Sequence, residues 1–216
     1  IPFVSRVDPP TITSNPPSVG GVNATNTCKE NQVTFSANVQ LNGNTITQCL
    51  WNISNGVTQT CANPSSDGNV VLNYAFPNPG NYSATLTLTI STGQSLTSDP
   101  IEIKIYGPQV PRITNPSSNG QELVHPVNIT WDINNVFTFP NDPSNKYNVY
   151  FGSNPLTMTS ICSNLHPSIN TCGPIDLALL GSNNLYVSVQ AVSGPNCASR
   201  SGVGGNGGTY RFFSFT

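Results

Sequence analysis

The residues that could carry acid–base or nucleophilic chemistry are few and scattered. The chain has two histidines, His125 and His166, each directly before a proline, and nine acidic residues that occur singly. A catalytic triad needs a histidine beside a nucleophile, and sugar hydrolysis needs a pair of carboxylates. No motif or spacing in the sequence indicates a catalytic triad or a carboxylate pair. The sequence therefore predicts no catalytic residue, and we expect a protein that is not an enzyme.

Metal and cofactor ligands are equally hard to find. Calcium would need several closely spaced acidic ligands, and a zinc ribbon would need Cys-x-x-Cys pairs, but the chain has neither. Asp67 and Asp142 stand next to Gly68 and Pro143, as turn-forming residues do. The glycine-rich run 202–208 lacks the lysine and the helix of a phosphate-binding loop. We expect no metal and no cofactor.

Six cysteines are the most informative reactive residues. An even number without metal-type spacing favours disulfides in an oxidising compartment, with buried free thiols of a cytosolic protein as the alternative. Three cysteines fall in each half of the chain, so full oxidation requires at least one bond that crosses between halves or between molecules. We expect two local loops and one crossing bond: Cys49–Cys61, Cys162–Cys172 and Cys28–Cys197.

Four Asn-x-Ser/Thr sequons could accept N-linked glycans, and they begin at Asn23, Asn52, Asn81 and Asn128. About that many arise by chance in a chain so rich in Asn, Ser and Thr, so their position matters more than their number. Asn128 alternates with apolar neighbours, Asn52 follows a tryptophan, and Asn81 lies at a Pro-Gly corner. These positions predict outward-facing side chains that could carry glycans, and simple exposed asparagines are the alternative.

The composition limits the possible partners and compartments. Only 7% of the 216 residues are charged, against about 25% in an ordinary domain, and the net charge is −2 without a basic cluster. This argues against nucleic-acid binding. The longest apolar stretches have four or five residues, far short of a membrane span. The chain starts at Ile1, as it would after removal of a secretory signal or in a trimmed chain, and we expect an extracellular, secreted protein.

The elements that position these residues show the alternation of apolar and polar residues that is typical of half-buried strands. Turn residues separate them, and no helical period of useful length occurs. The alternating runs are 33–39, 82–90, 101–105, 127–133, 147–151, 185–191 and 210–215. The sequence predicts an all-β fold of two tandem Ig-like antiparallel β-sandwiches with an extended N-terminal strand.

A proline-rich segment, 106–112, interrupts the strands near the middle of the chain. Residues 10–18 and 111–118 resemble each other and lie about a hundred residues apart, so each copy is expected to open a sandwich. We therefore divide the chain into an extended N-terminal segment, residues 1–9, and two sandwiches, residues 10–107 and 108–216.

The first sandwich resembles the PKD family of Ig-like domains. The resemblance rests on 49–54, where Trp51 stands on a central strand, and on 74–88, where Pro79-Gly80 and Tyr82 lead into a strand of alternating Thr and Leu. It covers roughly residues 20–106. It implies that Trp51 fills the space between the sheets and that the ring of Tyr82 points inward.

The second sandwich is similar to fibronectin type III and to Ig-like modules of fungal wall glycoproteins. The similarity rests on Ile113-Thr114, on Ile129-Thr130-Trp131 and on the strand 185–191. The two resemblances together indicate a secreted cell-surface or filament-forming glycoprotein. Modules of this kind serve adhesion, spacing and assembly far more often than chemistry.

Two functions are compatible with these observations. Residues 1–9 alternate apolar side chains and precede Pro9-Pro10, as in a strand that is donated to a neighbouring subunit, with Ile1, Phe3 and Val7 as the contact residues. Repeated donation would build a homopolymer of covalently glycosylated copies, and a simple edge strand or frayed end is the alternative use of this segment. The second function is a monomeric adhesive or carbohydrate-binding module of a larger surface protein.

Overall fold

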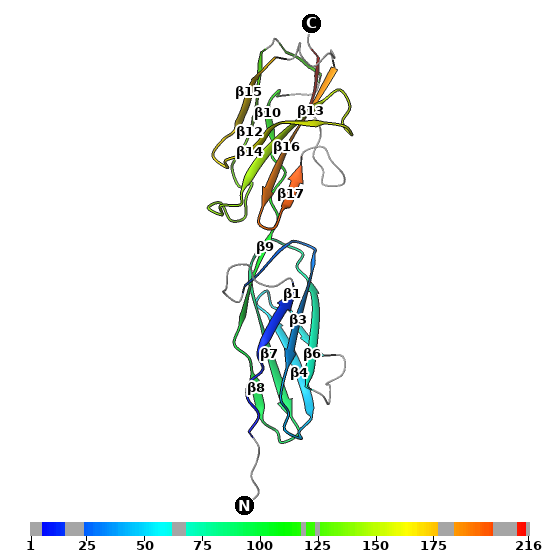
Figure 1. Ribbon diagram of the computed structural model, residues 1–216, viewed down its shortest axis with the longest axis vertical. Coiled ribbons are helices and arrows are strands. Elements are labelled where there is room, and N and C mark those ends of the chain that lie inside the picture. The colour runs from blue at the N-terminus through cyan, green and yellow to red at the C-terminus, as the bar shows by residue number, and fades with distance from the viewer. Residues whose placement is uncertain are drawn as a thin grey trace, which may run out of the picture. The chain divides into compact units, whose positions relative to one another are not determined.

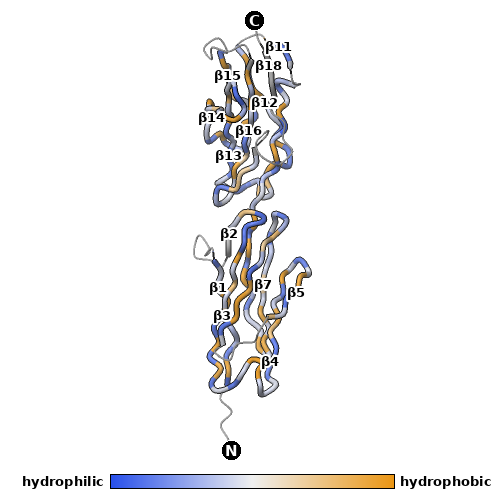
Figure 2. Tube along the Cα trace, turned by 90° about the vertical axis from the view of Figure 1, so that its right-hand side faces the viewer, coloured by the Kyte–Doolittle hydropathy of each residue, from blue (hydrophilic) through white to orange (hydrophobic). Residues whose placement is uncertain are grey.

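The computed structural model describes residues 6–15, 24–61, 68–117, 120–123, 126–176, 184–200 and 211–214. Every regular element in these ranges is a β-strand, which confirms the predicted all-β fold. The chain divides into two compact units, Ile1–Ile105 and Tyr106–Thr216 (Figure 1). Each unit is a sandwich with its own core, and hydrophobic stretches run along the strands of both (Figure 2).

The first unit packs a three-stranded sheet against a larger one. The smaller sheet has the order β1-β3-β6, and the larger has β2-β9-β7-β4-β5 with β8 also paired to β7. The strands are β1 (Ile12–Asn15), β2 (Ala24–Cys28), β3 (Gln32–Asn38), β4 (Ile46–Ile53), β5 (Thr58–Thr60), β6 (Asn69–Ala75), β7 (Gly80–Ile90), β8 (Ser95–Thr97) and β9 (Ile101–Tyr106).

Alternation along these strands builds the first core. Trp51 on β4 is fully buried and its ring centroid lies 6.0 Å from that of Phe35 on β3, in the opposite sheet. On β7, Leu86 and Leu88 point into the same core, while the alternating Thr85, Thr87 and Thr89 face outward. The predicted role of Trp51 as the side chain between the sheets is therefore confirmed.

Tyr82 fixes the corner where the chain passes from β6 in one sheet to β7 in the other. Its hydroxyl donates a 3.0 Å hydrogen bond to the carbonyl oxygen of Asn78, and its ring packs against Phe76 with the centroids 4.8 Å apart. A tyrosine that bonds back to the backbone at this corner is typical of Ig-like sandwiches. Only the apolar part of the ring is needed for packing, and its polar end serves the turn.

The second unit repeats the same plan. Its smaller sheet has the order β10-β12-β15, and its larger sheet has β11-β18-β16-β13-β14 with β17 also paired to β16. The strands are β10 (Ile113–Asn115), β11 (Gln121–Glu122), β12 (Val127–Trp131), β13 (Lys146–Gly152), β14 (Thr159–Leu165), β15 (Thr171–Ile175), β16 (Asn184–Ser193), β17 (Cys197–Arg200) and β18 (Arg211–Ser214).

The second core is also centred on a tryptophan. Trp131 on β12 is 1% exposed, and its ring contacts Tyr147 on β13 edge to face with the centroids 5.4 Å apart. Phe151 on β13 and Val187 and Val189 on β16 complete the packing. In this unit the tryptophan comes from the smaller sheet, and in the first unit it comes from the larger sheet.

The N-terminal segment differs from the prediction at Val7. This side chain is 0% exposed and belongs to the core of the first sandwich, so it cannot at the same time contact a neighbouring subunit. The carbonyl oxygen of Arg6 accepts a 3.0 Å hydrogen bond from the side-chain amide of Asn42. Burying an apolar side chain in its own core is favourable, which explains why Val7 packs in the first sandwich. Ile1 and Phe3 lie outside the described residues.

Candidate functional sites

The titratable side chains of the described residues are not gathered into a reactive site. His166 lies in a turn, where its Nδ1 atom is 2.8 Å from the hydroxyl of Ser168. In the described ranges no group of three His, Cys, Asp or Glu side chains could hold a metal ion, and no helix is long and apolar enough to cross a membrane. His125 and Asp67 lie outside these ranges. What remains are modification sites, disulfides and surfaces.

Asp142 organises a cluster that the sequence did not reveal. One carboxylate oxygen accepts a 2.7 Å hydrogen bond from the hydroxyl of Tyr106, and the other accepts bonds from the backbone N–H and the hydroxyl of Ser144. The hydroxyl of Ser144 in turn accepts the N–H of Gly194. Burial raises the pKa of Tyr106 above its ordinary value, and the hydrogen bond to Asp142 and its negative charge raise it further.

Gly194 is required in this cluster by both space and conformation. Its φ is +55°, and a Cβ atom at this position would lie 2.3 Å from the ring of Tyr106. The cluster therefore closes one end of the second sandwich around a buried tyrosine. Tyr106 is 36 positions from Asp142, and Ser144 is 50 positions from Gly194, so a local motif could identify only the Asp142–Ser144 turn.

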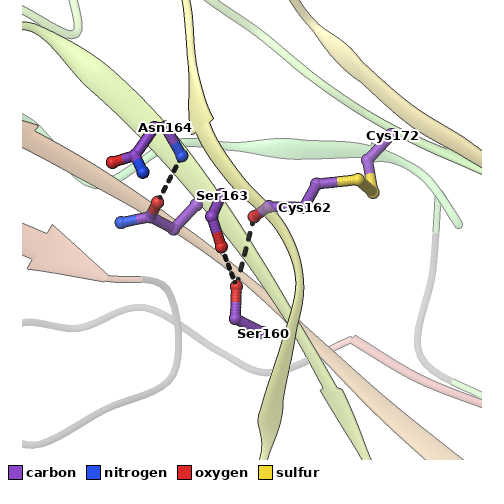
Figure 3. The surroundings of a disulfide bond; sticks show 6 residues. Ser160, Cys162, Ser163, Asn164 and Cys172 are labelled. Carbon is purple, nitrogen blue, oxygen red and sulfur yellow. Dashed lines mark hydrogen bonds between the residues drawn. A yellow bond between two sulfur atoms is a disulfide. The ribbon is translucent and has the colours of Figure 1, made fainter.

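The cysteines form local bridges that differ in what they connect. Cys49 on β4 pairs with Cys61, just after β5, with the Cα atoms 5.4 Å apart, so this bond links neighbours at one edge of a sheet. Cys162 on β14 pairs with Cys172 on β15 at 6.2 Å, and this bond joins the two sheets of the second sandwich (Figure 3). Cys28 and Cys197 are not free either. Their pairing with each other stays a prediction.

Two of the four sequons lie side by side on the larger sheet of the first unit. Asn52 on β4 is half-buried and Asn81 at the start of β7 is exposed, and both face away from the core. Ser54 and Ser83, which complete these sequons, are bonded to each other: Ser83 N–H donates to the Ser54 hydroxyl and Ser54 N–H donates to the Ser83 carbonyl, both at 2.9 Å. Glycans at both sites would therefore cover one face of one sheet.

The sequon at Asn128 belongs to the smaller sheet of the second unit. The side chain is exposed on β12, between the buried Val127 and Ile129. Its neighbour on β15 is Gly173, where a Cβ atom would lie 2.5 Å from the Asn128 side-chain oxygen. Asn128 therefore faces outward, as expected from alternation, and Gly173 beside it leaves room for the side-chain amide. Asn23 lies outside the described residues.

The exposed apolar side chains bear on the possibility of sugar binding. Proteins that hold sugars on a flat face commonly stack them on exposed aromatic rings. Among the described residues, the exposed large apolar side chains are all aliphatic: Leu50, Val71, Ile133, Leu156 and Ile169. The described aromatic side chains are buried or half-buried, as Tyr150 and Tyr186 are.

The fold and the sites define a class of protein first: two tandem Ig-like β-sandwiches, stabilised by disulfides and without a described catalytic or metal cluster. A scan against family models matches residues 14–105 to the PKD domain. The first unit is therefore PKD-like, as the resemblance predicted, and the second unit is a β-sandwich with the same strand order. PKD-like domains are non-catalytic modules, and together with disulfides they are typical of extracellular proteins.

Solved structures with a similar fold are distant in sequence. A PKD domain of an M14-like peptidase from Thermoplasmatales archaeon SCGC AB-540-F20 is 15% identical over 46% of this chain and 94% of that chain, with a TM-score of 0.37. The fibronectin(III)-like modules of Clostridium thermocellum CbhA are 14% identical over 95% and 93%, with a TM-score of 0.37. The FN1-FN3 domains of chicken CNTN1 are 13% identical over 97% and 67%, with a TM-score of 0.42. No curated protein matches the chain in sequence.

Proposed function

We propose that the chain is a structural subunit of an extracellular, glycosylated polymer or surface layer. The observation that carries this proposal is the nature of the outward faces. They are built from neutral polar side chains, with three sequons facing outward and no described exposed aromatic ring. A surface of this kind suits a spacer that is hydrated and modified, and among the described residues its exposed large apolar side chains are aliphatic and not the aromatic rings on which sugars stack.

The joining segment in this proposal is residues 1–6. Burial of Val7 fixes the point at which the chain enters the first sandwich, so a donated strand has to lie before it. Six residues can extend over at most roughly 20 Å, which is enough to pair along one edge of a neighbouring sheet. Ile1 and Phe3 supply its large apolar side chains.

Deletion of residues 1–6 tests the joining step, because it leaves Val7 and both cores intact. We expect the full chain to form polymers that sediment and are visible by electron microscopy, and the shortened chain to remain unassembled with unchanged circular dichroism. Phe3→Asp is a second variant, since it would bury an unpaired charge in the contact. Polymers of normal length from the shortened chain would contradict the donor role. A full chain that stays monomeric at all concentrations would favour the alternative, an adhesive module.

Glycosylation is tested separately from assembly. We expect Asn52, Asn81 and Asn128 to carry N-linked glycans in material from a secreting host, and enzymatic removal of N-glycans should convert each modified Asn to Asp, which mass spectrometry detects. Asn81→Gln should remove one glycan without changing the melting temperature, because the side chain is exposed. Unmodified asparagines at all three positions would contradict the proposal for these sites.

A further inference from the structure

Among the described residues, strand β6 is the last strand of the smaller sheet, and the orientation of its outer edge can be derived from the hydrogen bonds. Val39 N–H donates to the carbonyl of Gly68 at 2.9 Å, and Glu30 N–H donates to the carbonyl of Phe76 at 2.8 Å, so even-numbered residues of this strand direct their backbone groups toward β3. Backbone direction alternates in an antiparallel ladder. The N–H and C=O groups of Val71, Asn73 and Ala75 therefore point to the other side, where the described chain places no strand.

The other described edge strands are short or interrupted. Outer strands β1, β2, β5, β10 and β11 have five residues or fewer. Strand β14 has seven residues, but its pairing with β13 shifts register twice, and β15 contains Gly173-Pro174. By contrast, β6 pairs with β3 in an unbroken register over seven residues and contains no proline, glycine or charge. Proteins usually protect edges with such interruptions or charges, and β6 has none of them.

The charge and sequon distributions favour a second copy of the chain as the occupant of this edge. Pairing around a two-fold axis brings residues close to the axis near their own copies, so a charge there would approach a like charge. Strands β1, β3 and β6 contain no charged residue at all. The described sequons of the first unit, at Asn52 and Asn81, lie on the opposite sheet, so glycans there would leave the β6 edge open.

We propose that β6 pairs antiparallel with β6 of a second copy, with the two-fold axis at Leu72. Val71 of one copy then lies opposite Asn73 of the other, in both directions, and their free N–H and C=O groups complete a hydrogen-bonded ladder. The three-stranded sheets join into one continuous sheet of two copies. The exposed Val71, 48% accessible, becomes covered on the outer face. This contact does not involve residues 1–6 and is independent of the donated strand.

The test compares two lysine substitutions in the full chain by sedimentation velocity. Val71→Lys introduces a charge at the proposed contact, and Leu156→Lys makes the same kind of change on a loop of the second unit, where the side chain is 86% exposed. We expect reversible dimers of the unchanged chain, at least about tenfold weaker association for Val71→Lys, and no change for Leu156→Lys. A monomeric unchanged chain, or equal effects of the two substitutions, would overturn the proposal.

Engineered cysteines test the register. Antiparallel pairing at Leu72 places residues 71 and 73 of different copies about 5.5 Å apart between Cα atoms, within reach of a disulfide, whereas residue 71 is about 7–8 Å from its own copy. A mixture of V71C and N73C chains should therefore form crosslinked dimers under mild oxidation faster than either variant alone. Equal crosslinking in all three samples would overturn this register. Deletion of residues 1–6 should leave the dimer unchanged, which separates it from polymer assembly.

Discussion

The two sandwiches use the same strand order but fill their centres from opposite sheets. In the first unit the tryptophan stands on β4 of the larger sheet and meets Phe35 on β3 of the smaller one. In the second unit it stands on β12 of the smaller sheet and meets Tyr147 on β13 of the larger one. Each core therefore packs one indole against one smaller ring, and in this chain either sheet supplies either of them.

The disulfides of the two units also differ in which strands they connect. The bond Cys49–Cys61 reinforces two strands that already share a ladder, whereas Cys162–Cys172 connects strands of different sheets. The Cys49–Cys61 bond does not join the sheets of the first unit, which contact each other through the core and through a 3.3 Å hydrogen bond from the Asn55 side-chain amide to the Tyr74 hydroxyl. In the second unit a covalent bond adds to the packing between the sheets.

The largest effect is expected from removing the indoles. Trp51→Ala and Trp131→Ala should each lower the free energy of unfolding of their own unit by roughly 3 to 5 kcal/mol, because each leaves a large cavity between two sheets. Denaturant unfolding should show the loss, and hydrogen exchange should locate it in one unit only. Leu156→Ala, at an exposed position, is the matched control. Equal loss of protection in both units would mean that the cores are not independent.

Alternation in the sequence predicted strands that carry much of both cores, such as β3, β7, β13 and β16, and the inward direction of Trp131. The inward direction of Trp51 was implied by the resemblance to the PKD family, and strands such as β6 and β14 were not predicted. Each buried residue, such as Leu86 or Ile129, alternates with polar neighbours, and a period of two leaves little choice about which face is buried. The Tyr106–Asp142 cluster and the outer edge of β6 could not be predicted, because they depend on which distant segments become neighbours. Val7 was assigned wrongly for the same reason: its burial depends on tertiary packing.

A smaller effect is expected from removing the disulfides in pairs. Cys49→Ala with Cys61→Ala, and Cys162→Ala with Cys172→Ala, each open a loop of 12 or 10 residues, so each should cost about 3 kcal/mol by the loop-closure account. The strands that show increased hydrogen exchange should differ between the two double variants. Hydrogen exchange should increase at β14 and β15 in the second case, and only near β5 in the first. Increased exchange across both sheets of the first unit would contradict the distinction drawn between the bridges.

The smallest effect concerns the rings that face the tryptophans, Phe35 and Tyr147. The hydroxyl of Tyr147 is buried without a hydrogen-bond partner among the described residues. Tyr147→Phe makes the second pair equivalent to the first and removes an unsatisfied polar group, so we expect a change within about 0.5 kcal/mol or a slight gain in stability. Phe35→Tyr does the opposite and should cost roughly 1 to 3 kcal/mol. If Tyr147→Phe and Phe35→Tyr change the free energy of unfolding equally, the aromatic centres of the two cores differ in their access to water.

The pH dependence of stability tests whether the Tyr147 hydroxyl is buried or solvated in the folded protein. Burial, and secondarily the charge of Asp132, raises the pKa of Tyr147 from 10.0 to about 12. A folded-state pKa above the unfolded one means that the stabilising contribution is fully present below pH 10.0 and is lost as the pH rises toward about 12. The difference in unfolding free energy between the unchanged chain and Tyr147→Phe, measured by tryptophan fluorescence, should therefore be constant below pH 10 and shift in favour of the variant above it. A difference that stays constant through this range would show that the hydroxyl is solvated in the folded protein, and the two aromatic centres would then differ in hydration as well as in the origin of their tryptophans.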